Sequence, residues 1–113
     1  MSPITTHVLD TSTGRPAAGV KVQLLLVTEG GARQELASAA TNADGRITDL
    51  LPPGGADEGV YVLRFETAAY FTAQGRDSFF PRVEIEFCFD PEGGHYHVPL
   101  LLSPFGYSTY RGS

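Results

Sequence analysis

A chain of 113 residues, of which 42% are hydrophobic and 19% charged, has the size and balance of one soluble globular domain, so we expect a single domain over residues 1–113. The net charge of -5 argues against nucleic-acid binding, because neutralising phosphates requires clustered Lys and Arg. The single Cys88 excludes a disulfide within the chain, and residues 1–10 have neither the basic start nor the apolar core of a signal peptide. No apolar run is long enough to span a bilayer, so we expect a cytoplasmic protein with no membrane partner.

Alternation of apolar and polar residues with a period of two predicts β-strands along most of the chain. The clearest case is residues 81–90, where Val83, Ile85, Phe87 and Phe89 share one face. The first predicted strand begins at His7. The other predicted strands, in chain order, are residues 20–27, 34–41, 46–50, 60–67, 81–90, 95–103 and 107–111.

Turns and one helix separate these strands. Asp44 and Gly45 are expected to supply the positive φ angles of a tight turn, and residues 51–59 contain too much Pro and Gly for regular structure. One short surface helix is predicted between Thr67, its N-cap, and Gly75, its C-terminal stop. About seven or eight short strands with one short helix predict an all-β protein, a two-sheet β-sandwich.

The strand at residues 95–103 points to a functional surface, because it is apolar on both faces. If Leu100 and Leu102 face the core, His95 and His97 point outward, and we expect His95 to be an ordinary solvated side chain. Strands that are apolar on both faces are buried on both, and the second cover is most simply another subunit. His97 would then lie in a partly desolvated interface, where its pKa can be tuned for proton transfer.

A metal site is the alternative use of the histidines. His7, His95 and His97 could form an open three-histidine zinc site, since a His-x-His pair on one strand face is a known ligand geometry. Cys88 belongs to a different strand and no carboxylate flanks the pair, so we expect a site without metal or cofactor. Arg46, just after the predicted tight turn, would by itself be an ordinary solvated residue at a strand end.

Five segments taken together resemble the transthyretin-like 5-hydroxyisourate hydrolases. They are HVLDTSTGRPAAGVKVQL, TNADGRITDLL, YVLRFETAAYF, FFPRVEIEF and HYHVPLLLSPFGYSTYRGS. The resemblance runs from His7 to Ser113. Its most specific mark is Tyr-Arg-Gly-Ser at residues 110–113, an ending that the hormone-carrying transthyretins lack.

The resemblance implies a transthyretin-like subunit that assembles as a homotetramer, a dimer of dimers, with active sites in a channel at the dimer–dimer interface. By position, it implies the catalytic residues His7, Arg46 and His97. The substrate-binding residues that it implies are His7, Arg46, Tyr110, Arg111 and Ser113.

The implied reaction is the hydrolysis of 5-hydroxyisourate to 2-oxo-4-hydroxy-4-carboxy-5-ureidoimidazoline, in the degradation of urate to (S)-allantoin. Opening a cyclic amide with water needs a base, a group that stabilises the tetrahedral intermediate, and an acid for the leaving nitrogen. Two histidines can share the acid and base roles near neutral pH, and arginine can bind oxygens with its planar fork.

Two other classes of protein compete with the enzyme. A transthyretin-type carrier would use the same interface to bind a small ligand without chemistry, but it would need neither two histidines nor an arginine-bearing tail. A structural sandwich module would share the opening of residues 14–24, but such modules normally occur in longer secreted chains. The set of His7, His97 and residues 110–113 favours the hydrolase.

Overall fold

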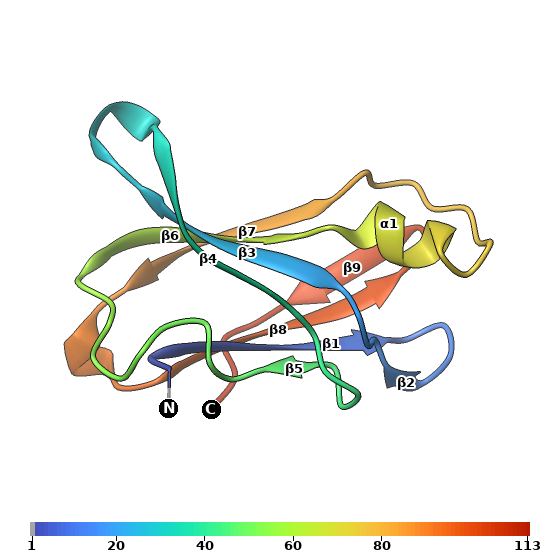
Figure 1. Cartoon of the computed structure of the whole chain (residues 1–113), viewed down its shortest axis with the longest axis horizontal. Coiled ribbons are helices and arrows are strands. Elements are labelled where there is room, and N and C mark those ends of the chain that lie inside the picture. Colours follow the sequence, from blue (N-terminus) through green and yellow to red (C-terminus); the bar gives the residue numbers. More distant parts are fainter. Residues whose placement is uncertain (1) are drawn as a thin grey trace.

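The computed structural model describes residues 2–113, whose strands form two stacked sheets (Figure 1). The strands are β1 (Ile4–Asp10), β2 (Arg15–Pro16), β3 (Lys21–Val27), β4 (Arg33–Ala40), β5 (Arg46–Ile47), β6 (Gly59–Phe65), β7 (Val83–Phe89), β8 (Tyr96–Ser103) and β9 (Gly106–Thr109). One helix, α1 (Thr67–Thr72), follows β6, and short 3-10 turns lie at Glu29–Gly31 and Pro91–Gly93. No helix among the described residues is long and apolar enough to cross a membrane.

The strand order confirms the predicted two-sheet sandwich. The first sheet has the order β2-β1-β8-β9, with β5 also paired to β1, and the second sheet has the order β4-β3-β6-β7. Strands β1 and β8 are parallel, and the other pairs are antiparallel. Of the nine strands in residues 2–113, only β2 was not predicted, and it is two residues long.

The inner faces of the two sheets meet in one apolar cluster, as the period-two pattern requires. In β7 the inward positions Val83, Ile85 and Phe89 are buried, whereas Glu84 and Glu86 are exposed. The largest fully buried side chains are Tyr61, Phe65, Phe71, Ile4, Leu24, Leu63, Leu100, Leu102, Val8, Val20, Val22 and Val62. Each large aliphatic or aromatic side chain of this kind contributes about 1.5–3 kcal/mol by burial.

One charged side chain, Asp10 at the end of β1, is fully buried. Its Oδ2 accepts hydrogen bonds from Tyr70 Oη at 2.9 Å and Arg76 Nη2 at 2.6 Å, and its Oδ1 accepts one from Ser12 N at 3.0 Å. Burial by itself would raise the pKa of Asp10, but the hydrogen bonds from Ser12, Arg76 and Tyr70 outweigh it, so the pKa is lowered. These bonds connect α1 and the loop after it to the first sheet.

Two local predictions were wrong. Among the described residues, positive φ occurs only at glycines, so Asp44 does not share this role with Gly45. The side chain of Asn42 shapes the turn instead, because its Oδ1 accepts hydrogen bonds from Asp44 N and Arg46 N. Thr67 is the first helical residue rather than the N-cap, and its buried Oγ1 has no hydrogen-bond partner.

The last strand is also shorter than predicted, since β9 ends at Thr109 rather than at Arg111. Leu100 pairs with Thr109, so a continued register would place Tyr110 opposite Pro99. Proline has no N–H to donate, and the regular ladder stops there. Residues 110–113 therefore form an irregular tail alongside β8.

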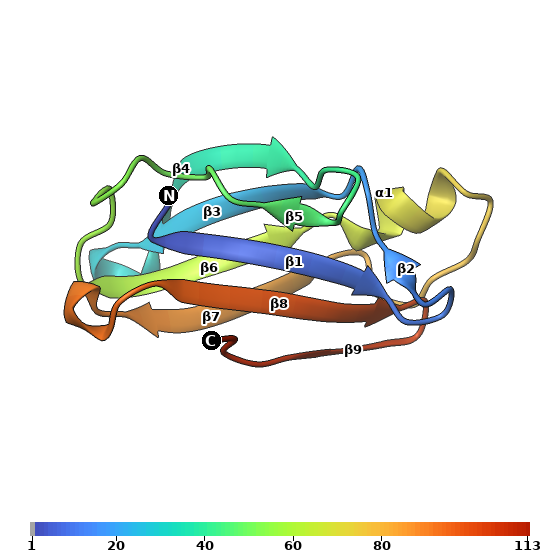
Figure 2. The same ribbon diagram turned by 90° about the horizontal axis from the view of Figure 1, so that it is seen from below.

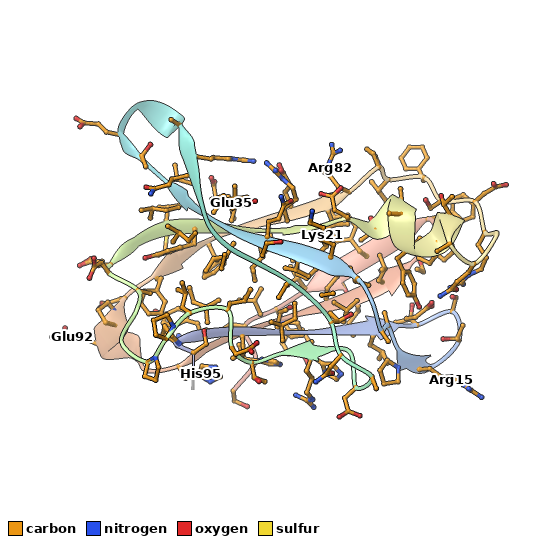
Figure 3. All side chains as sticks on the ribbon, in the orientation of Figure 1. Arg15, Lys21, Glu35, Arg82, Glu92 and His95 are labelled. Carbon is orange, nitrogen blue, oxygen red and sulfur yellow. The ribbon has the colours of Figure 1, made fainter. Side chains whose placement is uncertain are left out.

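The outer faces of the two sheets differ in chemistry. The second sheet carries alternating charges, including the bonds of Arg33 and Arg64 to Glu84 at 3.0 and 2.8 Å. Figure 3 shows Lys21 and Arg82 on this side of the molecule and His95 on the opposite side. The outer face of the first sheet instead presents the imidazoles, Thr5 and apolar residues, and the candidate site lies there.

Candidate active site

An open cavity of about 440 Å³ lies on the outer face of the first sheet. Figure 2 views the molecule from the side of this sheet, with β5, β1, β8 and the tail next to one another. The lining residues are Thr5, His7, Arg46, Thr48, His95, His97, Tyr110, Gly112 and Ser113. No Asp or Glu side chain is among these lining residues, so the fixed side-chain charge is the guanidinium of Arg46.

Strand register brings the predicted catalytic residues together. His7 of β1 pairs with Arg46 of β5, and Thr5 pairs with His97 in the parallel β1–β8 ladder. His7 and Thr5 are two residues apart on β1, so they share a face with Arg46 and His97. The Asn42 turn fixes the entry to β5, because Asn42 N also donates to Arg46 O at 3.0 Å.

Thr5 lies between two imidazoles. Its Oγ1 is 2.8 Å from His95 Nε2 and 2.8 Å from His97 Nδ1, and the residue is only 3% exposed. The expectation that His95 is merely solvated was wrong, because its ring is exposed but hydrogen-bonded in the same cluster. The two histidine rings have a centroid separation of 6.3 Å.

The surroundings favour the neutral form of two histidines. Burial, followed by the positive charge of Arg46, lowers the pKa of His7 below 6.5, although the backbone and carboxylate of Asp44 act in the opposite direction. Burial also lowers the pKa of His97, with further contributions from Arg46, His7 and His95. Both shifts favour the neutral imidazole near pH 7, the form that can accept a proton at one nitrogen and donate from the other.

The tail closes one side of the cavity through a single β-bridge between Gly112 and His97. Gly112 N donates to His97 O at 2.7 Å. A Cβ added to Gly112 would come within 2.7 Å of His97 Cδ2, so only glycine lets the tail pass this close to the ring. Tyr110 and Ser113, on either side of this bridge, line the cavity as predicted substrate-binding positions would.

Arg111 does not lie in this cavity. Its Cζ is 3.8 Å from the centroid of the Tyr96 ring, and its Nη2 donates to Gly93 O at 2.9 Å. Alternation along the tail explains this, because Arg111 falls between two residues that face the cavity. Within one subunit, its contacts hold the tail against the turn at residues 91–93.

No group of three His, Cys, Asp or Glu side chains in residues 2–113 is arranged to hold a metal ion. The alternative zinc site required His7, His95 and His97 to converge on one point. Instead, Thr5 Oγ1 is hydrogen-bonded to one ring nitrogen of His95 and to one ring nitrogen of His97.

Two stacked sheets and one short helix make this molecule a two-sheet β-sandwich, and a histidine–arginine cavity lies on its outer face. Sea bream transthyretin, solved in complex with thyroxine, matches 98% of this chain and 95% of its own with a TM-score of 0.93 at 37% identity. The 5-hydroxyisourate hydrolase of Klebsiella pneumoniae matches 97% of this chain and 98% of its own with a TM-score of 0.84 at 45% identity. A 5-hydroxyisourate hydrolase of Mus musculus is 47% identical over 114 residues, covering 99% of this chain and 96% of the relative.

The model of the HIUase/Transthyretin family matches residues 4–112, and the chain belongs to this family. Both a thyroxine-bound transthyretin and a hydrolase share the fold, so the fold alone does not separate a carrier from an enzyme. Whether the chain is a carrier or an enzyme has to be argued from the residues that line the cavity.

The sequence did not point to Thr5 or Thr48 as lining residues, and it did not show that His95 is hydrogen-bonded within the site. Thr5 has no motif of its own, and only the register of β1 against β8 shows that it faces His97. The His-x-His spacing is a usable signal for His95, because residues two apart on a strand face the same neighbour, here Thr5.

Proposed function

We propose that this chain hydrolyses 5-hydroxyisourate to 2-oxo-4-hydroxy-4-carboxy-5-ureidoimidazoline, within urate degradation to (S)-allantoin. The observation that carries the proposal is the convergence of His7, Arg46 and His97 in one cavity, in a chain whose relatives include proteins named 5-hydroxyisourate hydrolase. A cavity of about 440 Å³ is within the usual size range for a small-molecule site.

In this proposal, His7 and His97 share the proton transfers. A neutral imidazole takes a proton from the attacking water, and a histidine N–H returns a proton to the leaving ring nitrogen. Arg46 stabilises the negative oxygen of the tetrahedral intermediate, because its guanidinium charge is fixed and lines the same cavity. The route uses only side chains, so it requires no metal or organic cofactor.

We assign substrate binding to the tail as well. Tyr110 and Ser113 line the cavity and offer hydroxyl groups to the oxygens and nitrogens of the substrate ring. The contacts of Arg111 with Tyr96 and Gly93 favour a role in holding the tail over direct substrate binding within one subunit.

We further propose that the functional unit is a cytoplasmic homotetramer, a dimer of dimers, with the cavity at the dimer–dimer interface. Tyr110 is 58% exposed in the single subunit although it lines the cavity, and Leu101 of β8 is half-buried on the same outer face. A second, apolar cavity of about 260 Å³ is lined by the edge strand β7, by β8 and by the chain from Thr109 to Arg111. Exposed apolar surface and unpaired strand edges are typical of subunit contacts.

The thyroxine-bound relative supports a second candidate, a small-ligand carrier. The cavity described here favours the enzyme, because it concentrates three imidazoles and a guanidinium around a small space. A carrier for an apolar ligand would have little use for such groups.

The decisive experiment generates 5-hydroxyisourate with urate oxidase and follows its ultraviolet decay with and without this protein. We expect rapid decay with wild type, and a loss of about 10²–10⁴-fold in kcat/KM for His7→Ala and for His97→Ala, as for the removal of a general acid or base. Arg46→Ala should also lose activity, whereas Arg15→Ala, an exposed arginine on β2 that does not line the cavity, is the matched control. Stoichiometric thyroxine binding without faster decay of 5-hydroxyisourate would favour the carrier instead.

A further inference from the structure

We infer that Thr5 relays a proton between His97 and His95, so that the positive charge produced during catalysis moves from His97 at the cavity to the exposed His95. The inference deepens the proposed function and rests on it. It makes Thr5 and His95 positioning residues that act through His97. The observation behind it is the cluster in which one buried hydroxyl lies 2.8 Å from a ring nitrogen of each histidine.

The number of protons limits how this cluster can be arranged. A threonine hydroxyl has one hydrogen to donate, and the oxygen can accept from a neighbouring N–H. If His97 Nδ1–H donates to Thr5 Oγ1, then Thr5 donates to His95 Nε2; reversing both bonds gives the other complete arrangement. If both rings donated to Thr5 Oγ1, the hydroxyl hydrogen of Thr5 would have neither ring nitrogen as an acceptor. Thr5 is only 3% exposed, so an unpaired hydroxyl hydrogen there would cost about 1–3 kcal/mol.

The two complete arrangements correspond to two states of His97. In the first, His97 carries its proton on Nδ1, so Nε2 has a free lone pair and can act as a base. In the second, Nδ1 accepts from Thr5 and Nε2 carries the proton, so His97 can act as an acid. The direction of the Thr5 hydroxyl therefore determines which role His97 is ready to perform.

A balanced sequence of proton movements connects the two states. His97 Nε2 accepts a proton from the attacking water, His97 Nδ1–H passes its proton to Thr5 Oγ1, and Thr5 passes its own hydrogen to His95 Nε2. The water becomes a hydroxide equivalent bonded to the substrate carbon, His97 stays neutral with its proton on Nε2, and His95 becomes the cation. His97 Nε2–H can then donate to the leaving nitrogen, and the reverse relay restores the starting state.

The surroundings give this charge movement a direction. A cation on His97 would be half-buried and would face Arg46 on β5, His7 on β1 and His95, and these same features lower the pKa of His97. Arg111 of the tail is turned away, against Tyr96. His95 is exposed, so water can solvate its charge.

The test combines nuclear magnetic resonance with kinetics, using Thr5→Val, Thr5→Ser and His95→Gln in the full chain. Thr5→Val keeps the shape and removes the hydroxyl, Thr5→Ser keeps the hydroxyl, and His95→Gln removes a charge carrier at an exposed position where folding is not at stake. Thr11→Val is the matched control, since Thr11 is an exposed threonine just beyond the other end of β1.

We expect kcat to fall about 10²-fold in Thr5→Val and in His95→Gln, at the lower end of what acid–base catalysis contributes, with KM changed much less. Thr5→Ser should restore most of kcat. Imidazole nitrogen shifts of wild type should show one nitrogen of the neutral His97 ring carrying the proton, as the hydrogen bond to Thr5 Oγ1 requires, and Thr5→Val should change this tautomer whereas Thr5→Ser should keep it. Wild-type kcat in His95→Gln, or equal losses in Thr5→Val and Thr5→Ser, would overturn the relay.

The two proposals fail in different ways. If wild type does not hydrolyse 5-hydroxyisourate, the proposed function is wrong, whereas the imidazole nitrogen shifts still report on the Thr5 connection without any substrate. If wild type is active but Thr5→Val leaves the His97 tautomer unchanged, the relay is wrong and the hydrolase proposal stands.

Discussion

Gly112→Ala should inactivate the site while leaving the sandwich folded. The added Cβ would lie 2.7 Å from His97 Cδ2, whereas carbon atoms in contact prefer a separation of about 3.5–4.0 Å. Either the tail or the imidazole must therefore move by roughly 1 Å, and a displacement of that size at a catalytic group can cost about 10²-fold in rate. The φ angle of Gly112 is not in the left-handed region, so alanine causes no backbone strain.

The expected effect on stability is small because the tail can swing outward. Tyr110 and Ser113 are exposed, and surface substitutions usually change the free energy of unfolding by less than about 0.5 kcal/mol. The assay compares kcat/KM for 5-hydroxyisourate decay with the urea midpoint of unfolding. Gly106→Ala in β9 is the control, since its Cβ would meet Ser103 Oγ at an ordinary 3.7 Å. Wild-type kcat/KM in Gly112→Ala would refute the claim that the tail must press against His97.

Three further predictions concern pH, the tail and the buried carboxylate. Because the pKa values of His7 and His97 are lowered from 6.5, the neutral rings predominate at pH 7 and the acid-side half-loss of kcat/KM should lie below pH 6.5; a half-loss above pH 6.5 would contradict this. Deleting residues 110–113 should reduce activity at least about 10²-fold, the scale of acid–base and positioning effects, with little change in the urea midpoint. Asp10→Asn should destabilise the protein by about 1–3 kcal/mol at pH 7 by weakening the bond to Arg76. Since the folded-state pKa of Asp10 is lowered, this deficit should shrink as the pH falls below 3.8 and vanish once the pH is below the folded-state pKa. An equal deficit at every pH would show that the charge of Asp10 is not its source.

The sequence was sufficient to predict the strands of both sheets, because the alternation of apolar and polar residues determines which side of a strand is buried. It predicted the outward placement of His97 for the same reason. It could not predict that Thr5 contacts that histidine, since 92 residues separate them and the contact depends on the parallel register. The turn at Asp44 was misjudged because Asn42, two positions earlier, supplies the bonds that make a second positive φ unnecessary.

The tail shows a different limit. The resemblance assigned all of its polar side chains to the substrate, but alternation sends neighbouring residues to opposite sides. Arg111 consequently reaches Tyr96 instead of the cavity. Pro99 ended the regular pairing that a simple strand pattern had extended to Arg111, an effect that requires knowing which strands are neighbours.

The parallel pairing of β1 with β8 also affects how the protein acquires activity during synthesis. Thr5 and His7 leave the ribosome early, but they remain without their partners until β8 and the tail have been made. Such long-range pairings give a high contact order, for which folding times of milliseconds to seconds are typical. A nascent chain therefore cannot complete the cavity until its last residues have been made and the sandwich has closed.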